Sequence, residues 1–332
     1  MVPRSPLTRR RLGRTDLMIT PVALGCWPIA GITSLDVTEQ SSLDTLAAAV
    51  DAGINFLDTA YCYGYEGESE RLIARALGHR RNELVIATKC GIHWENRKQA
   101  KDGRPATLRR ECEESLRRLG TDNVDLLYLH APDPAIAIEE SAEALRHLQQ
   151  VGLTRSVGLS NASTEQLERF HRICPLAAYQ PHYNLLQREI EQAELPWCVA
   201  EQVSVIVYWP LLKGLLSGHL RRDHQFDERD GRKKYPMFQG EEWQRNQDFV
   251  DDLRLIANGL NCSLTELVVA WTISQPGITA ALCGAKRPEQ IRESAGGMSL
   301  PLSAETLAAI DQAIQRRGQP LSQAAVAPVR SR

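Results

Sequence analysis

The sequence predicts an α/β protein: a closed (β/α)8 TIM barrel with an N-terminal hairpin, a long loop after strand 7 and extra C-terminal helices. Eight short apolar runs alternate with amphipathic stretches along the 332 residues, which is typical of a parallel sheet covered by helices. The first run leads into Leu24-Gly25-Cys26-Trp27 and not into a GxGxxG turn. This favours a closed barrel over an open, doubly wound sheet.

The expected strands are nearly continuous apolar segments, as parallel strands buried on both faces are. They are Val22–Leu24, Phe56–Ala60, Leu84–Thr88, Asp125–His130, Ser156–Ser160, Ala177–Gln180, Val203–Trp209 and Ile278–Cys283. Residues 7–20 precede them and hold a turn signal between two short runs. We expect these residues to form a hairpin that closes the bottom of the barrel.

Helical patterns lie between the strands. Apolar residues recur at spacings of three and four in 108–119 and 138–148, so each stretch forms one apolar stripe. Serines that open 163–166 and 263–266 stand three residues before Gln or Glu, which is capping-box spacing. Pro288 suits the first turn of a further helix.

The domain organisation follows from these elements. Residues 7–318 are expected to form one barrel domain, and 319–332 a flexible tail. Residues 213–245, rich in Gly, His, Arg, Lys and Asp, are too long for an ordinary connection. In a barrel such an insertion lies at the carboxyl ends of the strands, where ligands bind.

Composition excludes several function classes. The net charge is −2, with 43% hydrophobic and 24% charged residues, so nothing indicates nucleic acid or an anionic membrane as a partner. The sequence has no apolar run of about 18 residues and no signal-peptide pattern. Its eight cysteines include no CxxC pair, so we expect reduced thiols and no bound metal. We therefore expect a cytoplasmic protein, a monomer or weak homo-oligomer.

Four ionisable residues follow three consecutive expected strands. Asp58 and Tyr63 follow the second strand, Lys89 the third, and His130 ends the fourth. Taken singly, each has a structural explanation as a turn, capping or solvated residue. Because the carboxyl ends of the strands form one rim of a barrel, we expect all four to meet there.

Such a cluster suits protonation of an oxygen that becomes anionic. A phenol has a pKa of about 10, and a neighbouring ammonium is expected to lower it. Asp58 would supply the counter-charge that a buried Lys89 needs. His130 would hydrogen-bond the reacting oxygen or share in the proton transfer.

A series of motifs carries a resemblance to a known family. In chain order they are Phe56–Gly64, Gly67–Glu70, Ala87–Lys89, Asp125–His130, Gly158–Asn161, Tyr179–Leu185, Tyr208–Leu211, Gly214–Gly218 and Gly284–Glu293. The set resembles the aldo-keto reductase superfamily, in a bacterial branch broadly related to potassium-channel β-subunit-like and inositol-related reductases. The resemblance runs from about residue 10 to 315.

The resemblance implies roles for particular residues. Tyr63 would be the general acid, Lys89 and Asp58 its tuning pair, and His130 the residue that orients the substrate carbonyl. The implied cofactor is NADPH, since Lys286 and Arg287 suit a 2′-phosphate. Its implied contacts are Trp27, Ser160, Asn161, Gln180, Tyr208, Pro210, Leu211, Lys213, Gly214, Ser217, Gly284, Lys286, Gln290, Glu293 and Ser294.

Within that set, Ser160, Asn161 and Gln180 would hold the nicotinamide carboxamide, and Tyr208 would stack under the ring. The loop 210–217 would wrap the pyrophosphate, and the residues from 284 onward would meet the adenosine.

The chain departs from the family pattern at a few positions. Ser294 replaces the usual Asn, and Trp209 stands where many members have Ser. Cys26, Cys62 and Cys90 are expected near the rim, either as small packing residues or as sites of oxidant sensitivity. The basic run 232–234 is offset by neighbouring acids and is interpreted as a solvated loop.

Three functions are compatible with these residues. The first is NADPH-dependent reduction of an aldehyde or ketone. The second is a cofactor-binding regulatory protein with little turnover, and the third is a lyase or isomerase that uses Lys89 as a Schiff base. The substrate stays open, although Trp27, Tyr61, Trp94 and Trp209 suggest an aromatic-lined pocket to which His93 and Glu95 would add polar contacts.

Overall fold

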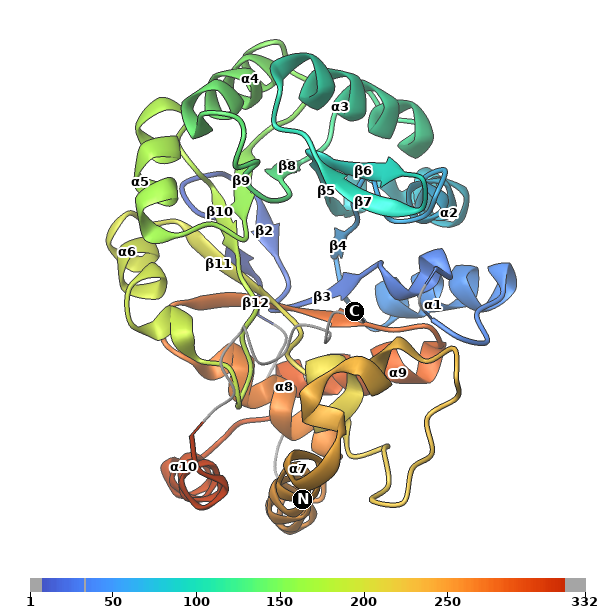
Figure 1. Cartoon of the computed structure of the whole chain (residues 1–332), viewed down its shortest axis with the longest axis vertical. Helices are drawn as coiled ribbons and strands as arrows, with labels where there is room; N and C mark the ends of the chain where they lie inside the picture. Colours follow the sequence, from blue (N-terminus) through green and yellow to red (C-terminus); the bar gives the residue numbers. More distant parts are fainter. Residues whose placement is uncertain (1–7, 33, 320–332) are drawn as a thin grey trace.

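A computed structural model describes residues 8–32 and 34–319 and shows a closed barrel of parallel strands in a ring of helices (Figure 1). Around the barrel the strands follow the order β10-β11-β12-β3-β4-β5-β8-β9. Every neighbouring pair in the ring is parallel. The predicted (β/α)8 barrel is therefore confirmed.

All eight predicted strands form, with ends that differ by one or two residues. They are β3 (Val22–Gly25), β4 (Phe56–Asp58), β5 (Val85–Cys90), β8 (Leu126–Leu129), β9 (Val157–Ser160), β10 (Ala178–Gln180), β11 (Ser204–Tyr208) and β12 (Ile278–Gly284). Their side chains are almost all buried. This explains why the runs are apolar at nearly every position.

The α-helices are α1 (Glu39–Asp51), α2 (Glu68–Leu77), α3 (Pro105–Leu119), α4 (Ile138–Gln150), α5 (Thr164–Ile173), α6 (Glu194–Ala200), α7 (Gly240–Gly259), α8 (Leu264–Ser274), α9 (Pro288–Gly296) and α10 (Ala304–Arg317). Short 3-10 turns are η1 (Pro28–Ala30), η2 (Gly78–Glu83), η3 (Glu189–Glu191), η4 (Leu212–Ser217), η5 (Gly231–Lys234), η6 (Pro236–Phe238) and η7 (Gly297–Ser299).

The predicted helix starts are confirmed. Ser163 and Ser263 each accept a hydrogen bond from the third helical residue, which bonds back in a capping box. Pro288 is the first residue of α9, where its missing N–H costs no helical bond.

The N-terminal hairpin closes the bottom of the barrel, as predicted. Strands β1 (Arg10–Arg11) and β2 (Met18–Ile19) pair antiparallel. Leu12, Leu17 and Ile19 pack into the barrel interior with side chains such as Phe56. Apolar burial of this kind contributes roughly 25 cal/mol per Å², so the hairpin stabilises the barrel while covering its lower end.

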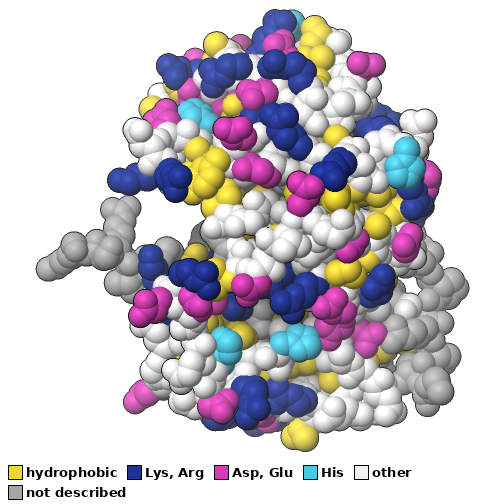
Figure 2. Space-filling view, turned by 90° about the vertical axis from the view of Figure 1, so that its right-hand side faces the viewer, with side chains coloured by type: hydrophobic (Ala, Val, Ile, Leu, Met, Phe, Trp, Pro, Cys, Tyr) yellow, Lys and Arg dark blue, Asp and Glu magenta, His cyan; other side chains and the backbone are white. Residues whose placement is uncertain are grey.

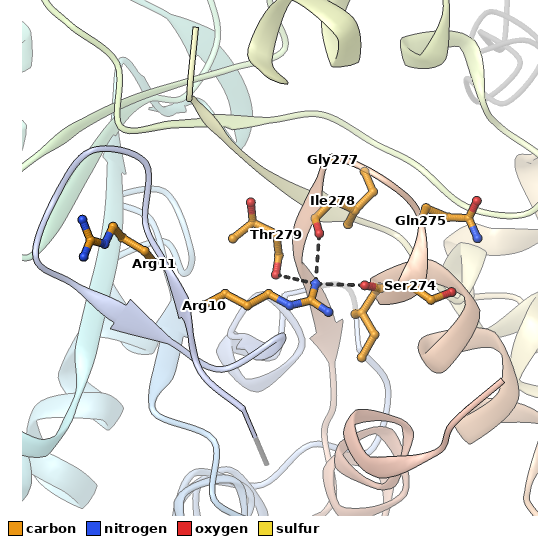
Figure 3. Close-up of a pocket in the computed structure, with 8 residues that line it drawn as sticks. Arg10, Arg11, Ser274, Gln275, Gly277, Ile278 and Thr279 are labelled. Atoms are coloured by element: carbon orange, nitrogen blue, oxygen red, sulfur yellow. Dashed lines mark hydrogen bonds between the residues drawn. The ribbon is translucent and has the colours of Figure 1, made fainter. Parts of the chain in front are cut away.

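Arg10 ties this hairpin to the last barrel strand (Figure 3). Its Nη1 donates to the carbonyl oxygens of Ile273 at 2.8 Å, Ile278 at 3.0 Å and Thr279 at 3.2 Å. A pocket of about 350 Å³ lies beside these residues. Because β12 begins at Ile278, this pocket lies at the amino ends of the strands, away from the rim that carries the predicted site.

The predicted long connection after β11 contains η4, η5, η6 and then α7. The gold loop before α7 runs out beside α9 in Figure 1. Helices α7 and α10 pack together, and Arg317 of α10 pairs with Glu242 and donates to Asn246. The C-terminal helix is thereby fixed to the insertion. The predicted tail, 319–332, falls outside the described residues except for Gln319.

Positive and negative side chains are interspersed on the face of the molecule seen in Figure 2. The mixture agrees with the net charge of −2. Across residues 8–32 and 34–319, none of the helices has the length and apolarity needed to cross a membrane.

Candidate active site

Four predicted residues meet at the carboxyl ends of three neighbouring strands. Asp58 ends β4, Lys89 lies in β5 and His130 directly follows β8. Tyr63 lies in the turn between β4 and α2, where its N–H bonds to the Ala60 carbonyl at 2.9 Å. In barrels this rim is where ligand-binding and catalytic side chains gather.

Lys89 and Asp58 form a buried ion pair. Lys89 Nζ lies 2.5 Å from Asp58 Oδ1, and their side chains are 0% and 1% exposed. Lys89 also donates to the Thr59 carbonyl at 2.8 Å, and Gln180 Nε2 donates to the other Asp58 oxygen at 2.8 Å. Burial raises the pKa of Asp58, while Lys89 and Gln180 oppose that rise. Both charged groups therefore have hydrogen-bond partners in addition to each other, which a buried ion pair needs to be stable.

Tyr63 lies directly against this pair. Its hydroxyl is 3.3 Å from Lys89 Nζ, and its ring packs edge-on against Trp27 at 5.1 Å and His130 at 5.9 Å between centroids. The backbone bends sharply at Gly64, whose φ is +113°. There a Cβ would lie 2.5 Å from the Glu68 amide nitrogen. A side chain at position 64 would therefore displace the turn that carries Tyr63.

One expectation about Tyr63 is wrong. Lys89 was expected to lower the pKa of the phenol, but that pKa is raised well above its ordinary value. Burial is the main cause, and the Asp58 carboxylate acts in the same direction. Both effects oppose the lowering of this pKa that the neighbouring Lys89 ammonium was expected to cause. Tyr63 is therefore a neutral phenol at ordinary pH.

His130 is a neutral imidazole. Burial, together with the charges of Lys89 and Lys101, holds its pKa well below the usual range. Its backbone N–H bonds to the Cys90 carbonyl at 2.9 Å, which fixes it beside β5. Its Nδ1 lies 3.6 Å from the sulfur of Cys62.

The residues expected to hold a nicotinamide lie next to His130. Asn161 Nδ2 donates to the His130 carbonyl at 3.0 Å, and the Tyr208 hydroxyl donates to Asn161 Oδ1 at 2.7 Å. Ser160 Oγ donates to the Gln180 carbonyl at 2.8 Å. These contacts bring the ends of β9, β10 and β11 to the same rim as the four ionisable residues.

The loop expected to wrap a pyrophosphate adopts an unusual backbone. Lys213 and Gly214 both have positive φ, at 56° and 90°, inside the short turn η4. Ser217 Oγ donates to the Gly214 carbonyl at 2.8 Å. Pro210 is buried and Leu211 half-buried, so both help to seat this loop.

Lys213 is held between aromatic rings. Its Nζ lies 3.9 Å from the centroid of Trp209 and 4.5 Å from that of Tyr235. Burial and the nearby Arg232 charge lower its pKa to about 8. Trp209, at a position where the family pattern has Ser, thus serves as a platform for this cation.

The residues expected at an adenosine surround the start of α9. Gln290 Oε1 accepts from the Lys286 N–H at 2.9 Å, and Lys286 Nζ donates to the Leu35 carbonyl at 2.7 Å. Glu293 lies 3.1 Å from His219 Nε2. Gly284 is exposed at the end of β12.

Ser294 does not join this group. It is only 2% exposed and bonds to the thiol of Cys283. The expected hydroxyl contact to an adenine is therefore not supported, because the side chain is turned into the core.

A hairpin that the sequence pattern does not predict lies beside the turn that carries Tyr63. Strands β6 (Ile92–Glu95) and β7 (Lys98–Lys101) pair antiparallel, with Trp94 opposite Gln99. Trp94 Nε1 donates to the Cys62 carbonyl at 2.9 Å, and Gln99 lies 3.8 Å from the Cys62 sulfur. The run Lys98–Lys101 lacks β-branched and aromatic residues, so the sequence pattern does not indicate a hairpin here.

His93 points to the other face of that hairpin. Its two ring nitrogens lie 2.9 Å from Glu111 and 3.1 Å from Glu95. Because successive side chains alternate across a strand, His93 faces α3 while Trp94 faces the turn that carries Cys62 and Tyr63. The expected polar contribution of His93 and Glu95 to a substrate pocket is not supported.

The interpretation of 232–234 as a solvated loop is incomplete. Arg232 is offset by Asp230 at 2.7 Å, but its side chain is only 33% exposed. It donates to the Lys213 carbonyl at 3.3 Å. This contact joins positions 19 residues apart, so no local pattern indicates it.

The arrangement fits a nicotinamide dinucleotide. Hydrogen bonds link the His130 carbonyl to Asn161 and Asn161 to Tyr208, and the Lys213 ammonium lies over the ring of Trp209, the next residue in the chain. No group of three or more potential metal ligands occurs in residues 8–32 and 34–319.

Fold and site together define a barrel oxidoreductase. The model of the aldo/keto reductase family matches residues 21–315, and the chain belongs to that family. It is 35% identical to aldo-keto reductase YhdN of Bacillus subtilis (strain 168), over 83% of this chain and 84% of that protein. It is 32% identical to the NADH-specific methylglyoxal reductase of Escherichia coli (strain K12), over 88% and 94%.

Solved structures agree with this membership. The glycerol dehydrogenase AKR11B4 of Gluconobacter oxydans is similar with a TM-score of 0.88 and 36% identity, over 95% of this chain and 98% of that one. The holo form of aldo-keto reductase AKR11C1 from Bacillus halodurans has a TM-score of 0.77 and 25% identity, over 96% and 100%.

Proposed function

We propose that the protein is an NADPH-dependent reductase that converts an aldehyde or ketone to the alcohol, with Tyr63 as the general acid. When bound, the nicotinamide supplies the hydride that the carbonyl carbon receives. Tyr63 gives its hydroxyl proton to the carbonyl oxygen, so the product is a neutral alcohol. The observation that carries the proposal is that Lys89 Nζ contacts both Asp58 and the Tyr63 hydroxyl inside the rim.

The protonation states of the residues suit this assignment. The raised pKa of Tyr63 keeps the phenol protonated, which is the form that a proton donor needs. Lys89 donates toward the phenol oxygen and would stabilise it as the proton leaves. Neutral His130 would orient the carbonyl by a hydrogen bond without competing as an acid.

Asp58 acts through Lys89. Its carboxylate holds the ammonium 2.5 Å away and leaves Nζ within 3.3 Å of Tyr63. We therefore assign Asp58 as a positioning residue and Tyr63, Lys89 and His130 as catalytic residues.

For the cofactor, we propose Ser160, Asn161, Gln180 and Tyr208 as contacts to the nicotinamide, and the loop 210–217 as the contact to the pyrophosphate. Lys286 and Arg287 would pair with the 2′-phosphate, which only NADPH carries. The E. coli relative is named as NADH-specific. The preference is therefore tested by titrating both dinucleotides into the same protein.

The substrate is proposed to be a small carbonyl compound that enters between aromatic side chains. Trp27 packs on the ring of Tyr63, and Trp94 donates to the carbonyl of Cys62, the residue before Tyr63, which supports a role for both in lining the pocket. Tyr61 instead bonds to Glu114 on α3 at 2.9 Å, which places its hydroxyl away from the pocket.

A Schiff-base role for Lys89 is disfavoured by its surroundings. The amine is fully buried and donates to a carboxylate, a carbonyl and a phenol. Such an ammonium has no free lone pair for attack on a carbonyl carbon. Borohydride trapping with a carbonyl substrate is expected to label no lysine.

The testing experiment is steady-state oxidation of NADPH with an activated aromatic aldehyde, methylglyoxal and a short panel of aldoses. Tyr63→Phe is expected to lose at least roughly 100-fold in activity, the usual scale for removing a general acid. The matched control is Tyr65→Phe, in the same turn, with a side chain that is 44% exposed. It is expected to keep wild-type activity.

Two results would contradict the proposal. Full activity in Tyr63→Phe would remove the assigned acid. Tight binding of NADPH without turnover on the whole panel would favour a regulatory cofactor-binding protein instead.

A further inference from the structure

The hairpin of β6 and β7 has one face turned toward the rim that carries His130. Side chains alternate along each strand, and Trp94 lies directly opposite Gln99. Trp94 donates to the Cys62 carbonyl at 2.9 Å, and Gln99 lies 3.8 Å from the Cys62 sulfur. That sulfur lies 3.6 Å from His130 Nδ1. The face that carries Trp94 and Gln99 is therefore the one next to the imidazole.

Lys101 shares this face, because it lies two residues further along β7 and side chains at that spacing point the same way. It also lies at the base of the hairpin. The N–H of Asp102 bonds to the Gly91 carbonyl at 3.1 Å, and the carbonyl of Cys90 accepts from the His130 N–H at 2.9 Å. Lys101 is thus placed beside the strand end to which His130 is bonded.

The ammonium of Lys101 is close enough to act on the imidazole. After burial and the charge of Lys89, it is the third cause of the lowered pKa of His130. Lys101 is exposed, and in the part of the chain that the structure describes it forms no ion pair within 4.0 Å. The ammonium therefore stands at the edge of the site without a neighbouring carboxylate from those residues.

The acids near the hairpin lie on its other face. Glu95 bonds to one ring nitrogen of His93 at 3.1 Å, and Glu111 of α3 bonds to the other at 2.9 Å. Lys98 stands opposite Glu95 and belongs to that face too. The hairpin thus separates two lysines, Lys98 on the face with the acids and Lys101 on the face toward the rim.

We propose that Lys101 is a specificity-determining residue that binds a carboxylate carried by the carbonyl substrate. The assignment rests on the proposed function and names a substrate class for the same site. The reacting carbonyl would lie at Tyr63 and His130, and the carboxylate at the Lys101 ammonium. A lysine is a single point charge, which matches the unit charge of a carboxylate better than the nearly two charges of a phosphate at neutral pH.

The test compares two aldehydes of nearly the same size, 4-carboxybenzaldehyde and its neutral methyl ester, in the NADPH assay. The quantity measured is the ratio of kcat/KM for the acid to kcat/KM for the ester, in wild type, Lys101→Gln and Lys101→Arg. Because the intrinsic reactivities of the two aldehydes are the same for every variant, a change in this ratio reports recognition of the carboxylate. Lys98→Gln is the matched control, since it removes one cation from the same strand on the opposite face.

Lys101→Gln is expected to lower the ratio roughly 10-fold, mainly through a higher KM for the acid, as for the loss of a hydrogen bond to a charged group. Lys101→Arg is expected to keep most of the wild-type ratio, because it retains the charge. Lys98→Gln is expected to have the wild-type ratio. Added salt is expected to lower the ratio of wild type and to leave that of Lys101→Gln unchanged, since salt screens an exposed charge pair.

Other outcomes overturn the assignment. An equal ratio in Lys101→Gln and wild type would remove Lys101 from the substrate site, and an equal loss in Lys98→Gln would make the effect one of the overall charge of the hairpin. A ratio in Lys101→Arg as low as that in Lys101→Gln would show that the charge is not the cause. If wild type reduces neither aldehyde, the proposed function itself fails, which differs from a ratio that the variants leave unchanged.

Discussion

Lys89 Nζ lies 2.5 Å from Asp58 Oδ1, and water reaches almost none of either side chain. Taking two charges out of water is costly, and their attraction repays the cost only when both are fully hydrogen-bonded. Here Thr59 and Gln180 supply the remaining partners. The ion pair is therefore expected to affect two properties that can be measured separately, the stability of the fold and the activity of the site.

Lys89→Met is expected to destabilise the protein by about 3–5 kcal/mol, because it leaves the Asp58 carboxylate buried without its cation. The double variant Lys89→Met with Asp58→Asn is expected to recover most of that loss, yet to remain inactive. Urea unfolding with a turnover assay measures both effects.

The control for this pair is Arg75, which pairs with Glu39 at the surface, where both side chains are 62% exposed. Arg75→Met is expected to cost less than about 1 kcal/mol. If the double variant were no more stable than Lys89→Met, the unpaired carboxylate would not be the cause.

The second prediction concerns pH. The raised pKa of Tyr63 and the lowered pKa of His130 leave both groups neutral through the neutral range. The proton-donating form of Tyr63 is then lost only in strong alkali, and His130 gains a proton only in acid. Carbonyl reduction is expected to show a flat kcat/KM between about pH 6.5 and 9, whereas an unperturbed histidine, with a pKa of about 6.5, would be half protonated at the lower limit.

The same protonation states of Tyr63 and His130 predict a different pH dependence for alcohol oxidation. That direction needs Tyr63 to accept a proton as the phenolate, whose population rises with pH. The rate of NADP⁺-dependent alcohol oxidation is expected to increase across the same range. For reduction, a fall in kcat/KM on the acid side of this range would show that the pKa of His130 is not lowered, and a fall on the alkaline side that the pKa of Tyr63 is not raised.

The barrel could be predicted because its signals are local. Each strand is an apolar run, and each of Ser163 and Ser263 stands three residues before its capping partner. The convergence of Asp58, Lys89 and His130 also follows, since the parallel strands that carry them end at one rim.

The remaining features depend on contacts between distant residues. Arg232 approaches Lys213 across a loop whose path no periodicity describes. The pKa of Tyr63 depends on its burial and on its distance from the Asp58 carboxylate, and sequence spacing gives neither quantity. The resemblance implies Ser294 as a cofactor contact, but on α9 its side chain bonds to the thiol of Cys283.

The third prediction concerns a buried charge network behind Lys89. Glu70 is fully buried and accepts from Thr88 at 2.7 Å and from Arg118 at 3.3 Å. Arg118 also donates to the Tyr61 carbonyl at 3.1 Å, just before the Tyr63 turn. Arg118→Met leaves Glu70 without its cation and is expected to cost about 3–5 kcal/mol.

The neighbouring Arg117 is exposed on the same helix and provides the control. Arg117→Met is expected to change stability by less than about 0.5 kcal/mol. Thermal unfolding of the two variants measures the difference, and equal melting temperatures would show that the Glu70 network contributes no stability.

The last prediction concerns the three cysteines near the rim. Cys26, Cys62 and Cys90 are all buried, and burial raises the pKa of each, that of Cys62 to about 12. Only a thiolate reacts readily with oxidants or disulfide reagents, so these thiols are expected to be inert in the folded protein. Cys262, the half-buried thiol among the described residues, is expected to react first with a disulfide reagent, and the others only after unfolding.

Activity is expected to survive mild peroxide, with Cys62→Ala matching wild type in its resistance. Rapid inactivation of wild type that Cys62→Ala prevents would instead make the contact between Cys62 and His130 a point of oxidative control.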